Sequence, residues 1–171
     1  YHGFLITHGE SISIADHLTL SENGAVVYRP TVNYAYHPCD DAVLSLDEMA
    51  GKQWQPPREW RIIRDEIVAG MDELGVLLMG SAKGIYWFGS RLSIEQARQL
   101  APYNNATSMQ VAAGALAGMV WALRNPEAGV VEPDDLDHER VLEIAKPYLG
   151  EVVGVSGDLT PRRDRDWPFS E

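Results

Sequence analysis

The chain has 171 residues, of which 45% are hydrophobic and 23% are charged, as in an ordinary globular domain. Its 25 acidic and 14 basic residues give a formal net charge of −11. Such a surface repels phosphate backbones and attracts cations, which argues against a nucleic-acid partner. The single cysteine, Cys39, cannot form a disulfide within the chain, which favours the cytoplasm.

The first third of the chain predicts short elements separated by turns. Residues 10–18 fit both a strand and a short helix, and we favour the helix. Asn23-Gly24 is a turn signal, and Pro38 ends the strand that is expected after this turn. The expected elements are a strand at 4–7, a helix at 10–18, a strand at 25–36 and a helix capped by Asp40 or Asp41 that stops at Gly51.

The remainder predicts further strands and helices without a regular alternation. Ser93-Ile94-Glu95-Gln96 and Thr107-Ser108-Met109-Gln110 each have the spacing of a capping box at a helix start. The expected elements are strands at 60–68, 74–79 and 85–88, helices starting at Ser93 and Thr107, a helix at 134–148 and a strand at 151–156. This irregular order predicts an α+β fold, with a mixed sheet packed by helices.

The expected organisation is one domain over residues 1–161, followed by a charged tail at 162–171. The longest apolar run, Val111–Leu123, has 13 residues and is too short to span a bilayer, so we expect a buried helix and no membrane partner. The chain opens at Tyr1, directly before a strand pattern, with no signal segment. We interpret it as part of a longer protein.

His8 and Glu10 form the first candidate site, because they follow the first expected strand. An imidazole beside a carboxylate in a loop can transfer protons near neutral pH. The alternative is structural: Glu10 or Ser11 starts a helix and His8 is a loop histidine. Spacing alone favours this structural interpretation.

Asp72 and Trp87 are candidates for binding a cation. Asp72 and Glu73 precede an apolar strand, in which neighbours point to opposite faces, so one of them would face a site and pair with an ammonium group. A solvated loop is the alternative. Trp87 lies in an aromatic run, and its indole face could cover a cation, although core packing is the favoured interpretation.

Other motifs carry weaker hypotheses. His37, Cys39 and the two aspartates that follow could hold a metal, but helix capping explains the acids, and we expect no metal. Gly80-Ser81-Ala82-Lys83-Gly84 resembles a phosphate loop, yet a hairpin turn is favoured. Gly114 and Gly118 make a flat helix stripe that a second backbone could approach, either a sheet of the same domain or a second subunit.

Five stretches together resemble bacterial homospermidine synthases and, more broadly, saccharopine-reductase-like and carboxynorspermidine dehydrogenases. They are Ile6–Asp16, Tyr34–Pro38, Gly75–Gly80, Tyr86–Ser90 and Gly118–Leu123. The resemblance extends from about residue 3 to 161 and covers only the C-terminal part of that enzyme. It implies a substrate-binding and dimerisation domain, with NAD held by an N-terminal Rossmann domain that is absent from this chain.

The resemblance also implies an activity. Two putrescines would be joined into homospermidine with loss of ammonia, by NAD-dependent oxidation, Schiff-base exchange and reduction. His8 is similar to the family's active-site histidine of this region, and Asp72 to its substrate-binding acid; Glu10 and Trp87 would join Asp72 at the amine. The implied partners are a diamine substrate, a second subunit in a homodimer and the N-terminal NAD domain. The chain has no G-x-G-x-x-G motif, so by itself it is expected to be inactive.

Two other functions remain open at this stage. One is a non-catalytic dimerisation and recognition domain. The other is a relative acting on saccharopine or carboxynorspermidine, for which Arg61, Arg64 and Arg91 could bind the carboxylates. We expect His8 to face the cleft toward the missing domain and His37 to be structural.

Overall fold

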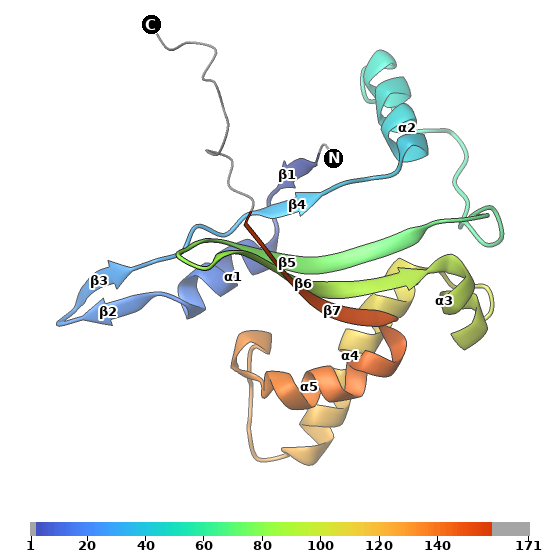
Figure 1. Cartoon of the computed structure of the whole chain (residues 1–171). Coiled ribbons are helices and arrows are strands. Elements are labelled where there is room, and N and C mark those ends of the chain that lie inside the picture. The colour runs from blue at the N-terminus through green and yellow to red at the C-terminus, as the bar shows by residue number, and fades with distance from the viewer. Residues whose placement is uncertain (1–2, 159–171) are drawn as a thin grey trace, which may run out of the picture. The chain divides into compact units, whose positions relative to one another are not determined.

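The computed structural model describes residues 3–158 (Figure 1). The chain divides into two compact units, one formed by residues up to 61 together with 132–135, and the other by 62–131 and the residues from 136 on. Helices and small sheets occur together, which confirms an α+β fold. All strand pairs between residues 3 and 158 are antiparallel, so the mixed sheet was a wrong prediction. The predicted tail at 162–171 lies outside the described residues.

The first unit contains two helices and two small sheets. Its elements are β1 (Phe4–Ile6), α1 (Gly9–His17), β2 (Leu20–Glu22), β3 (Ala25–Tyr28), β4 (Tyr34–Tyr36) and α2 (Asp40–Gly51). β1 pairs with β4, and β2 with β3. Asn23 and Gly24 both have positive φ, 51° and 80°, which is the backbone that a tight hairpin turn requires. Local turn chemistry therefore defines the β2–β3 hairpin.

The first unit confirms one prediction and corrects two. The helix favoured at 10–18 is present as α1 (Gly9–His17), and Ala15 is buried. The single strand predicted at 25–36 is wrong, because it is two strands with different partners, and Pro30 between them has no N–H to donate to a sheet. The N-cap of α2 is Cys39, and the two aspartates lie in the first turn, where negative charge is favourable.

The predicted strand at 60–68 is also wrong. Residues 52–70 form turns and irregular backbone with no strand. The side chains of Trp60, Ile62 and Val68 are 78%, 82% and 85% exposed. An apolar run forms a strand only when another strand pairs with it, and this run has none among the described strands.

The second unit is built on an antiparallel sheet in the order β5-β6-β7. Its elements are β5 (Met71–Ser81), β6 (Gly84–Ser93), α3 (Ile94–Leu100), α4 (Ala106–Arg124), α5 (His138–Ala145), the 3-10 turn η2 (Lys146–Tyr148) and β7 (Glu151–Gly157). Gly80 and Gly84 have φ of 96° and 89° at the β5–β6 turn, which confirms the hairpin interpretation of that glycine-rich segment.

The helices differ from their predictions mainly at their ends. The capping box at Ser93 is present. α4 begins one residue before Thr107, because Asn105 caps it by accepting a hydrogen bond from the amide of Ser108. The single helix predicted at 134–148 is interrupted: a 3-10 turn, η1 (Pro133–Asp135), comes first, and Asp137 caps α5. Tight local turns at both ends shorten this helix.

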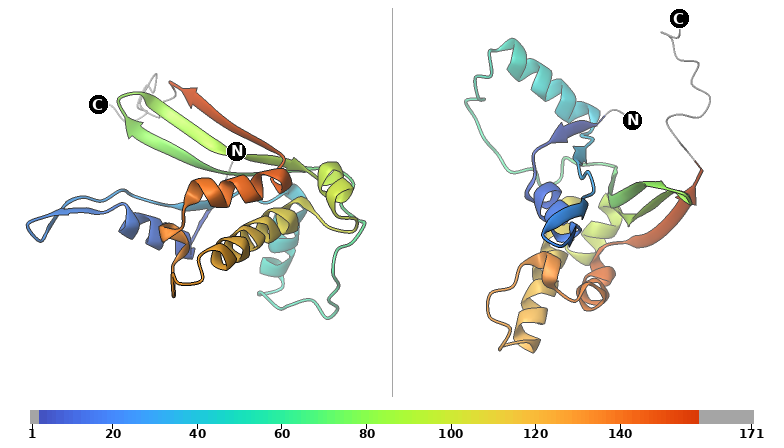
Figure 2. Two further views of the ribbon diagram at one scale, coloured as in Figure 1. Left: turned by 90° about the horizontal axis from the view of Figure 1, so that it is seen from below. Right: turned by 90° about the vertical axis from the view of Figure 1, so that its left-hand side faces the viewer.

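The core of the second unit lies where helices meet the sheet and each other (Figure 2). One cluster joins Leu92 of β6 to residues of α3 and α4, and another joins α4 to α5. Their buried members are Leu92, Ala97, Ala106 and Met109, and Ala113, Ala117 and Ala145. Small alanines allow α4 and α5 to lie side by side.

α4 is buried on one face only. Val111 and Leu123 of the predicted buried run are 69% and 81% exposed, while Ala113 and Ala117 contact α5. By length and a mean hydropathy of 1.3, α4 is the one helix among residues 3–158 that could cross a membrane. This alone argues only weakly for a membrane span, because core helices pass the same test.

Candidate active site

His8 stands at the junction of β1 and α1. It is the N-cap residue of α1, with extended backbone angles of −140° and 147°. The carbonyl of His8 accepts hydrogen bonds from the amide and the hydroxyl of Ser11. These bonds fix the backbone of His8 while its side chain, 44% exposed, remains available to a ligand.

Two side chains orient the imidazole of His8. The Glu10 carboxylate pairs with Nδ1. The ring stacks on Tyr34 of β4, with the ring centroids 4.3 Å apart and the planes 15° apart. The pairing of β1 with β4 places Ile6 opposite Tyr34, and so places Tyr34 beside the loop that follows β1. A carboxylate on Nδ1 favours the tautomer in which Nε2 is free to accept a proton.

Asp72 lies near the start of β5 and faces α4. Its cross-strand partner is Leu92, which is fully buried under α4, and such partners share one face of a sheet. Oδ2 of Asp72 accepts a hydrogen bond of 2.6 Å from the hydroxyl of Thr107. The neighbouring Glu73 points to the other face, where its Oε1 is 2.9 Å from Nε of Arg91. The sheet therefore separates the two adjacent acids.

Trp87 lies on the face of the sheet opposite to Asp72. Its cross-strand partner is Leu77, at an odd position of β5, whereas Asp72 occupies an even one. A Cβ added to either Gly75 or Gly89 would lie 2.7 or 2.5 Å from the indole ring. The indole therefore packs over two glycines and is half-buried, but it belongs to neither of the two core clusters of this unit.

The candidate residues therefore form separate groups. His8 and Glu10 are in contact in the first unit. Asp72 and Trp87 belong to the second unit and are not brought together. Sequence reasoning missed two contact residues, Tyr34 and Thr107. The first could have been found from strand pairing, but the contact made by Thr107 joins residues 35 positions apart.

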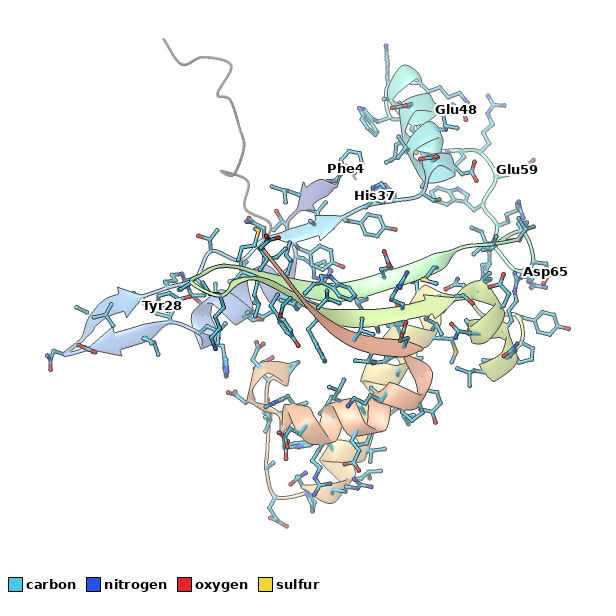
Figure 3. All side chains as sticks on the ribbon, in the orientation of Figure 1. Phe4, Tyr28, His37, Glu48, Glu59 and Asp65 are labelled. Atoms are coloured by element: carbon cyan, nitrogen blue, oxygen red, sulfur yellow. The ribbon has the colours of Figure 1, made fainter. Side chains whose placement is uncertain are left out.

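The remaining motifs do not add to this site. His37 lies on the segment between β4 and α2 (Figure 3). Within residues 3–158, no three or more His, Cys, Asp or Glu side chains are grouped so that they could hold a metal ion. An apolar hollow in the first unit is lined by residues of β1, β4 and α2, among them Phe4, Tyr36 and Leu46. His8 does not line it.

Gly114 and Gly118 face open space within the described chain. A Cβ built at either glycine meets nothing within 4 Å. The sheet of the same unit is therefore not the partner that approaches this stripe. The other alternative, a second subunit, remains a prediction.

Comparison with known proteins gives a consistent result over the whole chain. The sequence pattern of the saccharopine dehydrogenase C-terminal domain matches residues 1–158. The homospermidine synthase of Blastochloris viridis is 59% identical over 172 aligned positions, and that of Mesorhizobium japonicum 54% identical. Each alignment covers 99% of this chain and 36% of the relative, so the chain spans about a third of the relatives' length.

A solved structure agrees with these relatives. The homospermidine synthase of Legionella pneumophila, crystallised in complex with NAD, is 53% identical to this chain, with a TM-score of 0.91. The match covers 100% of this chain and 37% of that protein. The chain belongs to the saccharopine dehydrogenase C-terminal domain family.

Proposed function

We propose that this chain is the C-terminal substrate-binding and dimerisation domain of a homospermidine synthase. The whole protein would join two putrescines into homospermidine with release of ammonia, in an NAD-dependent reaction. The observation that carries this proposal is the match to a solved homospermidine synthase, at 53% identity and a TM-score of 0.91 over 100% of the chain. Identity at this level over a whole domain favours a shared substrate as well as a shared fold.

The described residues do not fit a dinucleotide site of their own. Residues 3–158 contain no parallel strand pair, and the sequence has no G-x-G-x-x-G motif. We therefore assign NAD to another domain of the whole protein, where it would supply hydride transfer. The roles left for this chain are to bind the amine and to move protons.

His8 is proposed as the proton-transfer residue. Amine chemistry requires a proton acceptor when an amine attacks and a proton donor when ammonia leaves. The Glu10 carboxylate on Nδ1 and the Tyr34 ring support one orientation of the imidazole, with Nε2 available. We propose that Glu10 orients the imidazole of His8. Its negative charge would also attract a cationic substrate.

Asp72 is proposed to bind an ammonium group of the diamine. A half-buried carboxylate whose position is fixed by Thr107 suits a charge-assisted hydrogen bond. Trp87, on the opposite face of the sheet, fits a packing role better than a cation–π contact at the same ammonium. Arg91 pairs with Glu73, which makes it a poor anchor for a substrate carboxylate.

We also propose that the protein forms a homodimer and acts in the cytoplasm. The exposed glycine stripe of α4 supports close approach of a second subunit. The single cysteine, Cys39, is exposed and free, as expected in a reducing compartment.

Substitution of Asp72 in the whole enzyme tests this proposal. Because a hydrogen bond to a charged group is worth roughly 1.5–3 kcal/mol, Asp72→Asn should lower kcat/KM for putrescine on the order of tenfold to a hundredfold or more. NAD affinity should be unchanged. The matched control is Glu73→Gln, an adjacent acid on the other face, which should keep normal putrescine kinetics. Unchanged kinetics in a correctly folded Asp72→Asn enzyme would remove Asp72 from the site.

A further inference from the structure

The hydroxyl of Thr107 is directed to Asp72 and is not used to cap its own helix. Thr107 is the second residue of α4, and the N-cap of α4 is Asn105, whose side chain accepts from the amide of Ser108 at 2.8 Å. The Thr107 hydroxyl instead donates to Oδ2 of Asp72 at 2.6 Å. The hydrogen bond thus connects the first turn of α4 to the start of β5.

The position of Thr107 is set by the core beneath it. Gln110, one turn further along α4, donates to the hydroxyl of Ser90 on β6, and each of these two residues is only 5% exposed. Ala106 and Met109 of the same helical turns pack against the fully buried Leu92. Thr107 is therefore held on a packed helix rather than on a loop, so its hydroxyl is a fixed point for the carboxylate.

We propose that Thr107 is a positioning residue that sets the place of the substrate ammonium group by holding the Asp72 carboxylate in one rotamer. The hydrogen bond occupies Oδ2 and leaves the Oδ1 lone pairs to accept from the ammonium. A fixed carboxylate also fixes the position of one end of a bound diamine, so the length of the diamine decides where its other end lies. Thr107 therefore contributes to selectivity for chain length as well as to affinity. This inference rests on the proposed function, because it requires Asp72 to bind the amine.

The experiment compares Thr107→Val and Thr107→Ser in the full-length enzyme. Valine keeps the β-branched shape and removes the donor, whereas serine keeps the donor. Thr107→Val should lower kcat/KM for putrescine on the order of tenfold. It should also reduce the preference for putrescine over the five-carbon diamine cadaverine, a ratio that a purely structural defect would not change. Thr107→Ser should recover both quantities to within about threefold of wild type.

A double-mutant cycle that combines Thr107→Val with Asp72→Ala separates this inference from the proposed function. If Thr107 acts through the carboxylate, Thr107→Val should cause no further loss in the Asp72→Ala background. An Asp72→Ala enzyme with wild-type putrescine kinetics would refute the assignment of Asp72 itself. If Asp72→Ala is impaired, two results would overturn the positioning role. One is a Thr107→Val enzyme with wild-type kinetics and selectivity. The other is a Thr107→Val substitution that lowers kcat/KM by the same factor in the wild-type and Asp72→Ala enzymes. Should Thr107→Val fail to fold, Thr107→Ala serves in the same cycle.

Discussion

Replacement of His8 by alanine should separate catalysis from stability. The side chain is 44% exposed, and its contacts are the stack on Tyr34 and the pair with an exposed Glu10. An aromatic pair contributes about 0.5–1.5 kcal/mol and an exposed ion pair about 0–1 kcal/mol. Both groups lie at the surface, so we expect the unfolding free energy to fall by about 1 kcal/mol.

The expected loss of activity is much larger than this. General acid–base catalysis contributes about 10²–10⁴-fold, which corresponds to roughly 3–5 kcal/mol of activation free energy. The assay measures kcat/KM for putrescine with the full-length His8→Ala enzyme, and urea unfolding of the 171-residue chain measures stability. The matched control is His37→Ala, which should change kcat/KM by less than about threefold if His37 is structural.

The opposite pattern would refute the reasoning. If His37→Ala abolished turnover while His8→Ala retained it, the two histidines would have been assigned in reverse. A His8→Ala chain that unfolds during purification would show that the imidazole supports the β1–α1 junction rather than the chemistry.

The remaining predictions concern the cofactor, assembly and packing. Calorimetry should detect no tight NAD binding by the chain alone, and micromolar affinity would contradict the placement of NAD on another domain. The chain should sediment at about twice its mass of 19.0 kDa. The new Cβ of Gly118→Ala meets nothing within 4 Å of the chain, so this substitution should stabilise the separated subunit by about 1 kcal/mol but weaken the dimer. A dimer of unchanged strength would exclude this stripe from the interface. Gly89→Ala places a Cβ 2.5 Å from the carbonyl oxygen of Leu74 and should destabilise the fold by about 1–3 kcal/mol in urea unfolding, and wild-type stability would refute close packing there.

Local sequence signals predicted the helix ends and turns that are formed by residues only a few positions apart. Ser93 and Gln96 cap a helix because their side chains reach amides only three residues away. Asn23-Gly24 predicts a turn because these residues tolerate positive φ. The α+β class and the proton-transfer candidate His8 followed from the same reasoning and from the resemblance.

Segments that need a distant partner were predicted poorly. Residues 60–68 have strand composition but no partner strand among the described residues, and residues 25–36 divide between two partners. Composition records how well a residue suits a sheet, yet pairing depends on hydrogen bonds with a segment elsewhere in the chain. For this reason the sequence could not show where one strand ended and the next began.

The sequence by itself determined the turns and most helix starts, because each depends on neighbours along the chain. It also determined the family, through five stretches taken together, and the residue types available for amine chemistry. Only the tertiary structure decided which of these residues meet. The register of β5 against β6 sends Asp72 toward α4 and Trp87 to the opposite face. The packing of α4 on Leu92 then brings Thr107 to Asp72 across 35 residues. Cross-strand register and helix packing are set by the whole core, so no local pattern could have revealed this contact.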